Sequence, residues 1–203
     1  MTDSILFYFD FSSSYSYIAY ARLAEIERKT GLIVEKRPIV LGAVFHQLGH
    51  TVPDSSSVKM QYLTHDLMRI AMSMGIAYQT PPIFPFNGIE AMRIYCALDE
   101  QQASQALEFS SRVFDSAYAQ NIDMSKSVNI AAILSDMGLE YDEIVNAESF
   151  DHAKVKLKEN TQLAVESKVF GAPTFVYRSE LFWGADRIDM LIDKVSEQSK
   201  LNN

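Results

Sequence analysis

The sequence predicts an α/β fold in which a β-α-β unit at the start and a β-β-α unit at the end are separated by a long helical stretch. Three observations predict it. An apolar run over Ile5–Phe11 precedes an amphipathic helical pattern and a second apolar run, Leu32–Val40. Helical periodicity then dominates from about residue 41 to residue 169. Two short apolar runs and a last amphipathic segment complete the second unit.

The first unit is expected to hold two parallel strands. Ile5–Phe11 is apolar enough for a buried strand, and the apolar spacing after it predicts a helix over Tyr15–Lys29. Gly31 is a suitable C-terminal stop for this helix. Leu32–Val40 is the second strand, and Pro38 marks its end or a sheet edge because proline cannot donate to a ladder. A strand, a helix and a strand joined by short turns form a parallel βαβ unit.

The remaining elements follow from the same periodicities. Helices are expected over 58–74, about 90–97, 101–119, 127–137 and 150–167. Ser149 is the expected N-terminal cap of the last of these. Met68, Met72 and Met74 lie in a helical pattern and are expected in the core. Strands at 171–177 and 181–183 then form a hairpin before a final helix over 185–196.

This order of elements is that of the thioredoxin fold, split by a large all-helical insertion between its two halves. Residues 1–41 and 170–203 are expected to form the thioredoxin-like domain. Residues 42–169 are expected to form the inserted helical domain.

Composition limits the classes of function. The 203 residues carry a formal net charge of -8, which argues against a nucleic-acid or an anionic-membrane partner. The single cysteine, Cys96, excludes an internal disulfide and a C-x-x-C redox pair, and its apolar helical surroundings predict structural burial. His46 and His50 lack the glutamate of a metalloprotease and a third ligand, so no metal is expected. Because no targeting segment is visible, a cytoplasmic location is expected.

Ser12, Ser13, Ser14 and Ser16 cluster where the first predicted helix begins. A strand-to-helix junction presents backbone N–H groups and the positive end of the helix dipole, which stabilise a thiolate or another anion. Serine is also a leading N-cap residue. This stretch alone therefore allows either a cap or an anion site.

Two motifs near the end of the chain also allow two interpretations each. Gly171-Ala172-Pro173-Thr174 is either an ordinary turn or a cis-proline loop that faces the first helix and pairs with an extended peptide. Asp186-Arg187 opens the last predicted helix. This pair serves either as a cap with an ion pair or as a site for an amino-acid zwitterion.

Taken in order, these motifs resemble the 2-hydroxychromene-2-carboxylate isomerases, thioredoxin-fold proteins allied to the kappa-class glutathione transferases and to the DsbA-type oxidoreductases. The first half of the resemblance rests on F-Y-F-D-F-S-S-S-Y-S-Y-I-A, then R-P-I-V-L-G-A-V-F with L-G-H-T-V-P. The insertion contributes K-M-Q-Y-L-T-H-D-L and F-P-F-N-G-I-E-A-M-R. The end of the chain contributes K-V-F-G-A-P-T-F-V and L-F-W-G-A-D-R-I-D.

The resemblance implies glutathione as the cofactor, with the reactive-site serine of the family falling on Ser13. The other implied contacts are Ala172 and Pro173 for the cysteinyl unit, Asp186 and Arg187 for the γ-glutamyl end, Lys59 as a basic contact, and His50. Two positions depart from the family pattern. Ser14 replaces the proline that usually follows the reactive serine, which leaves the choice among Ser12, Ser13 and Ser14 open. His50 replaces the asparagine of the transferase relatives.

The implied activity is the glutathione-dependent isomerisation of a conjugated aromatic 2-oxo acid. The reaction is of the type that converts 2-hydroxychromene-2-carboxylate to trans-o-hydroxybenzylidenepyruvate, by reversible thiolate addition. The alternatives are a kappa-class-like glutathione transferase and a non-catalytic peptide-binding module. Phe11, Tyr15, Phe86 and Trp183 are candidates to line an aromatic substrate pocket, or else belong to the core. The relatives are dimers, so a homodimer is expected.

Overall fold

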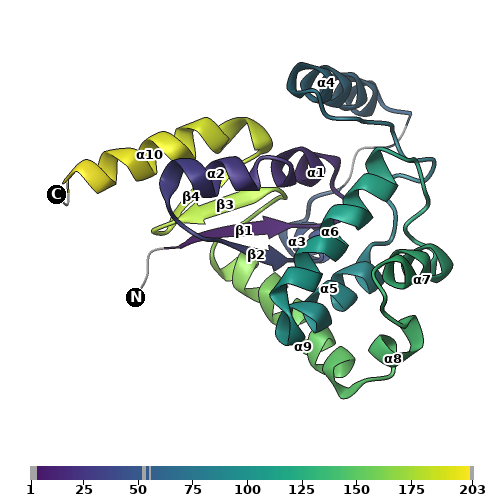
Figure 1. Cartoon of the computed structure of the whole chain (residues 1–203). Coiled ribbons are helices and arrows are strands. Elements are labelled where there is room, and N and C mark those ends of the chain that lie inside the picture. The colour runs from purple at the N-terminus through teal and green to yellow at the C-terminus, as the bar shows by residue number, and fades with distance from the viewer. Residues whose placement is uncertain (1–3, 52–53, 55, 202–203) are drawn as a thin grey trace.

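A four-stranded mixed sheet with the strand order β2-β1-β3-β4 forms the centre of the molecule (Figure 1). The computed structural model describes residues 4–51, 54 and 56–201. The strands are β1 (Ile5–Phe9), β2 (Val34–Pro38), β3 (Thr174–Tyr177) and β4 (Glu180–Trp183). β1 and β2 are parallel, whereas β3 is antiparallel to both β1 and β4. The predicted thioredoxin-like fold with a helical insertion is confirmed.

The helix predicted over residues 15–29 is instead two helices, α1 (Ser14–Tyr20) and α2 (Leu23–Thr30). The break lies at residues 21–22, where the Arg22 N–H donates to the Ala19 carbonyl, three residues back, at 3.0 Å. This tighter hydrogen bond ends the regular α-helical pattern. Periodicity could not reveal the break, because the apolar face continues through it.

The region between the two halves of the sheet is helical, as the periodicity predicts. Its helices are α3 (Leu41–Leu48), α4 (Val58–Met74), α5 (Ile89–Gln101), α6 (Ala103–Tyr118), α7 (Ser127–Asp136), α8 (Tyr141–Val145) and α9 (Glu148–Glu166). The prediction of Ser149 as a cap is wrong. Ser149 lies inside α9, and its hydroxyl accepts a hydrogen bond from the Gln101 amide at 2.9 Å. Ala147 occupies the N-cap position without a side-chain hydrogen bond.

The second half begins later than predicted, because β3 starts only at Thr174. Pro173 lacks the N–H that a ladder position needs. The predicted last helix is a short 3-10 turn, η1 (Ala185–Arg187), followed by α10 (Ile188–Leu201). The division into domains at residues 41/42 and 169/170 stays a prediction.

Alternate residues of β1 pack on opposite faces of the sheet. Phe7 and Phe9 belong to the large core cluster, which also holds apolar residues of α2, α6 and α10. Tyr8 points to a smaller cluster with Val44 of α3 and Ala164 of α9. In Figure 1, α2 and α10 accordingly cover one face of the sheet and α9 crosses the other. This two-residue alternation is the expected signature of a strand with both faces covered.

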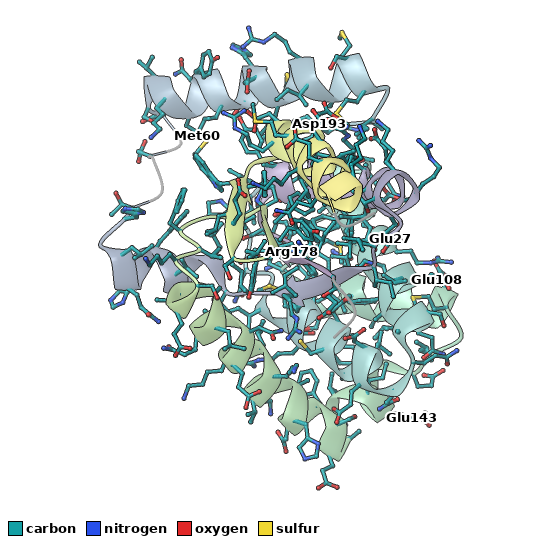
Figure 2. All side chains as sticks on the ribbon, turned by 90° about the vertical axis from the view of Figure 1, so that its left-hand side faces the viewer. Glu27, Met60, Glu108, Glu143, Arg178 and Asp193 are labelled. Atoms are coloured by element: carbon teal, nitrogen blue, oxygen red, sulfur yellow. The ribbon has the colours of Figure 1, made fainter. Side chains whose placement is uncertain are left out.

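α4 stands at one edge of the molecule in Figure 1, and among its residues only Leu67 and Ala71 are buried. The prediction that Met68, Met72 and Met74 fill the core is wrong, since all three are exposed and Met72 is 83% exposed. Figure 2, which labels Met60 on this helix, shows side chains of α4 projecting away from the rest of the protein. The apolar spacing correctly predicted a helix over these residues. Only part of its apolar face packs against the rest of the protein.

Cys96 of α5 is buried in the large core cluster, as its surroundings predict. Burial raises the pKa of its thiol to about 12, so the thiol is neutral at pH 8. We expect iodoacetamide to modify Cys96 in the folded protein about a thousandfold more slowly than in the urea-unfolded chain, because the thiolate is the reactive form. Mass spectrometry of timed samples measures both rates. Equal rates would contradict the burial of this side chain.

Candidate functional site

The loop between β1 and α1 is organised around the buried carboxylate of Asp10. One carboxylate oxygen accepts hydrogen bonds from the Ser12 N–H and the Ser12 hydroxyl, both at 2.8 Å. The other accepts from the Leu41 N–H at the start of α3, also at 2.8 Å. Burial raises the pKa of Asp10, against the lowering effect of these hydrogen bonds. One side chain therefore connects the serine loop to the start of α3.

The three adjacent serines have different partners. The Ser12 N–H and hydroxyl donate to Asp10, and the Ser14 side chain lies near the Tyr78 hydroxyl. The Ser13 hydroxyl accepts from the Ser16 N–H at 3.1 Å and donates to the Ala172 carbonyl at 3.0 Å. Ser13 is therefore the N-cap of α1 and also the serine that faces the proline loop, so the two interpretations of this cluster are compatible.

The Ala172–Pro173 peptide bond is cis, and the loop that contains it lies against the start of α1. The Pro173 carbonyl accepts from the Gly184 N–H at 2.9 Å, and the Thr174 hydroxyl donates to the Gly171 carbonyl at 2.7 Å. These two hydrogen bonds hold the backbone before and after the cis peptide bond in place. Among the described residues, none accepts a hydrogen bond from the Ala172 N–H. A partly exposed donor of this kind is available to a bound extended peptide.

Asp186 and Arg187 lie in η1, which packs against α1. They form an ion pair with each other at 2.9 Å, and both side chains are exposed to solvent. Gly184, just before them, has a φ of 102°, and a Cβ there would lie 2.5 Å from an Asp186 carboxylate oxygen. The glycine thus allows the aspartate to fold back over the turn. The pair is close to the Ser13 loop but is already self-neutralised.

Lys59 and His50 are less closely joined to the other predicted site residues. Lys59 is exposed in the first turn of α4, and His50 is exposed just after α3, with its ring centre 6.2 Å from that of Phe45. A hydrogen bond of 3.2 Å from the Tyr15 hydroxyl to an Asp66 carboxylate oxygen connects α4 to α1. Burial and the charge of Asp66 raise the pKa of Tyr15, so this tyrosine remains a donor.

The four aromatic candidates for a substrate pocket divide into two groups. Phe11 and Phe86 are buried in the core cluster, which is the second of the two alternatives that the sequence left open for them. Tyr15 is half-buried and is bonded to α4. Trp183 is 53% exposed and lies beside Phe170, a residue that the sequence did not single out.

Asp10 is the other contributor that sequence reasoning missed. Its signal was a carboxylate between Phe9 and Phe11 at the end of a buried strand. A charged group in such a position needs several donors around it. The pattern indicates that a network exists, but it does not identify Leu41 as a member.

Asp10→Ala is expected to lower the free energy of unfolding by about 2–3 kcal/mol, because two partly buried N–H donors and the Ser12 hydroxyl lose their acceptor. Asp54→Ala is the matched control, since Asp54 accepts from Ser56 in the same D-x-S pattern but is fully exposed. Urea denaturation of both variants provides the comparison. Equal losses of unfolding free energy in the two variants would show that the burial of Asp10 does not strengthen its contribution to stability.

A cavity of about 600 Å³ lies between the C-terminal half of α1, residues 76–77 and the C-terminal part of α6. None of the predicted site residues lines it, so it is separate from the Ser13 loop. Within the described part of the chain, no cluster of three metal-binding side chains occurs. Likewise, no helix among residues 4–51, 54 and 56–201 is both long and apolar enough to cross a membrane.

Comparisons with known proteins agree with the fold. The DSBA-like thioredoxin domain model matches residues 4–196. A 2-hydroxychromene-2-carboxylate isomerase from Pseudomonas putida is 32% identical over 188 residues, covering 91% of this chain and 90% of the relative. Glutathione S-transferase kappa 1 from Caenorhabditis elegans is 26% identical over 207 residues, covering 96% and 92%. A solved 2-hydroxychromene-2-carboxylate isomerase structure superposes with a TM-score of 0.82 at 27% identity, covering 98% and 97%.

Proposed function

This chain belongs to the 2-hydroxychromene-2-carboxylate isomerase family of DSBA-like thioredoxin proteins, and on that premise we propose that it is a glutathione-dependent isomerase of a conjugated aromatic 2-oxo acid. The observation that carries the proposal is the pairing of the Ser13 hydroxyl with the Ala172 carbonyl at 3.0 Å. It joins the serine at the start of α1 to the proline loop, the two parts that the family resemblance assigns to the thiol and the cysteinyl unit.

The residues present fit a bound glutathione. The Ala172 N–H has no acceptor among the residues that the structure describes, and together with the Ala172 carbonyl it provides a donor and an acceptor for an extended peptide unit. Asp186 and Arg187 offer opposite charges, which suits the ammonium and carboxylate of the γ-glutamyl end. Lys59 and His50 remain the candidates for further contacts, with His50 in place of the asparagine of the transferase relatives.

Glutathione, when bound, would supply a thiolate for reversible addition to the conjugated double bond, which is the chemistry that permits rotation about that bond. Ser13 acts as a hydrogen-bond donor to the sulfur and need not lose its proton. To donate to the sulfur, its hydroxyl would turn away from the Ala172 carbonyl, and that carbonyl would then be free to accept from the peptide ligand. A donor to the sulfur favours the thiolate over the thiol, whose free pKa is about 8.5.

Thermal stabilisation by reduced glutathione, together with the ultraviolet thiolate band, tests this proposal. Glutathione at about 100 times its Kd should stabilise the fold by about 2.7 kcal/mol. The thiolate band should appear with the unsubstituted protein, Ser12→Ala and Ser14→Ala, but not with Ser13→Ala. The absence of stabilisation in the unsubstituted protein would reject glutathione binding. A band lost in Ser12→Ala or Ser14→Ala, and kept in Ser13→Ala, would assign the sulfur contact to another serine.

A kappa-class-like transferase is the second candidate, favoured by the similarity to the kappa transferases. It would use the same thiolate but release a thioether as product. Isomerisation of a benzylidenepyruvate, measured beside conjugation of chlorodinitrobenzene, separates the two activities. Turnover of the first substrate without consumption of glutathione supports the isomerase.

We further propose a role in aromatic catabolism for a cytoplasmic homodimer, as the family resemblance implies. Small-angle scattering or light scattering of the purified protein tests the dimer. A mass of one chain, 22.9 kDa, at micromolar concentration would contradict it.

A further inference from the structure

Phe170 and Trp183 form an exposed aromatic pair beside the proline loop. Their ring centres are 5.0 Å apart at an interplanar angle of 56°, and the residues are 40% and 53% exposed. Large aromatic side chains bury much apolar area when they pack in a core. The rings of Phe7, Phe9 and Phe11 are fully buried, so this pair differs from the other aromatics near the loop.

The pair is held next to the Ser13 contact. Ser13 bonds to Ala172, and the preceding residue, Gly171, lies directly against Trp183. A Cβ placed on Gly171 would lie 2.6 Å from the indole Nε1. Trp183 also pairs with Thr174 across β3 and β4, and the next residue, Gly184, donates to the Pro173 carbonyl. The backbone at Trp183 is therefore joined to β3 and to the proline loop, and the indole lies against Gly171.

We propose that the Phe170–Trp183 pair is the subsite for the aryl ring of the substrate and makes the enzyme select aryl-substituted over aliphatic 2-oxo acids. The inference rests on the proposed function, because the subsite is located relative to the glutathione thiol at Ser13. Two exposed ring systems beside the proline loop offer an aryl group offset-stacked or edge-to-face contacts. An aliphatic chain gains only the apolar contact.

Trp183 is the single tryptophan of the chain, so its fluorescence reports on this subsite without any turnover. 3-Phenylpropionate should change the emission in a saturable way, whereas hexanoate, with the same charge and a flexible alkyl chain, should not at equal concentration. Phe170→Leu should weaken the response to 3-phenylpropionate about three- to tenfold. An identical response to both acids would overturn the proposal.

Gly171 offers a second, structure-specific test. Its φ is outside the left-handed range, so an alanine is allowed by the backbone but forces the indole to move. Gly171→Ala and Trp183→Leu should each raise KM for a benzylidenepyruvate about three- to tenfold, with kcat changed less. In the Trp183→Leu background, Gly171→Ala should add little, because its clash partner is gone.

Two controls make these outcomes specific. Trp183→Phe should restore most of the KM, and Met190→Ala, at an exposed residue of α10, should leave it unchanged. Thermal melts verify that each variant is folded. If glutathione still gives its thiolate band while Trp183→Leu keeps the preference for aryl over aliphatic substrates, the subsite is wrong and the isomerase proposal stands. If glutathione does not bind the unsubstituted protein, the proposed function itself fails.

Discussion

Ser13→Ala is expected to lower isomerase turnover about 100-fold, because it removes the one hydroxyl proposed to donate to the glutathione sulfur. The Kd of glutathione should change much less, since the peptide unit keeps its contacts with Ala172. The pH profile should shift as well. With the donor gone, the thiol pKa rises, so the rate of the variant should continue to increase at alkaline pH where the original enzyme has reached its plateau.

The control for this variant separates catalysis from helix capping. The Ser13 hydroxyl also caps α1, and its loss should cost about 1 kcal/mol of stability. Ser57 caps α4 in the same way, through a bond from the Met60 N–H. Ser57→Ala should lose similar stability while keeping its turnover. Equal turnover in Ser13→Ala and the unsubstituted enzyme would contradict the role of Ser13.

Phe114→Ala is expected to lower the free energy of unfolding by about 3–5 kcal/mol, the largest stability effect we predict. Phe114 of α6 is 1% exposed. Its ring centre lies within 6.3 Å of those of Phe9, Phe11, Tyr17, Tyr20 and Tyr118. Removing the ring would therefore leave a cavity where β1, α1 and α6 meet, and all three elements would lose packing contacts.

Urea denaturation of Phe114→Ala beside Val155→Ala measures this effect. Val155 of α9 is exposed, so its truncation should change stability by less than about 0.5 kcal/mol. Similar losses in both variants would mean that the aromatic cluster does not hold the helices on the sheet.

The sequence predicted the strands and most helices because two-residue and helical periodicities are local properties of the chain. It could not predict the break after Tyr20, where the Arg22 N–H bonds to the Ala19 carbonyl three residues back while the apolar pattern continues. It also could not separate Phe11 from Trp183, since both are aromatic residues next to strand ends. Their burial depends on which segments distant in sequence lie against them: Phe109 and Phe114 of α6 for Phe11, and Gly171 for Trp183.

The sequence placed two parts of the candidate site together only through the family resemblance. Ser13 and Ala172, which are far apart in the sequence, were assigned through the family resemblance, and the structure brings them to hydrogen-bond distance. The partners of Asp10 and Tyr15 were not predicted. Both bonds reach another loop or helix, at Leu41 and Asp66, and no local pattern specifies such a partner.

The position of α4 at the edge of the molecule has a consequence for amide hydrogen exchange. With only Leu67 and Ala71 buried, its local opening should require less free energy than that of the strands, and its amides should exchange first. Ser13 and Ala172 lie beside the central sheet, whereas Lys59 belongs to this helix. A ligand that bridges the two should slow exchange along α4 more than anywhere in the sheet. Exchange mass spectrometry with glutathione would thus show whether Lys59 takes part in binding.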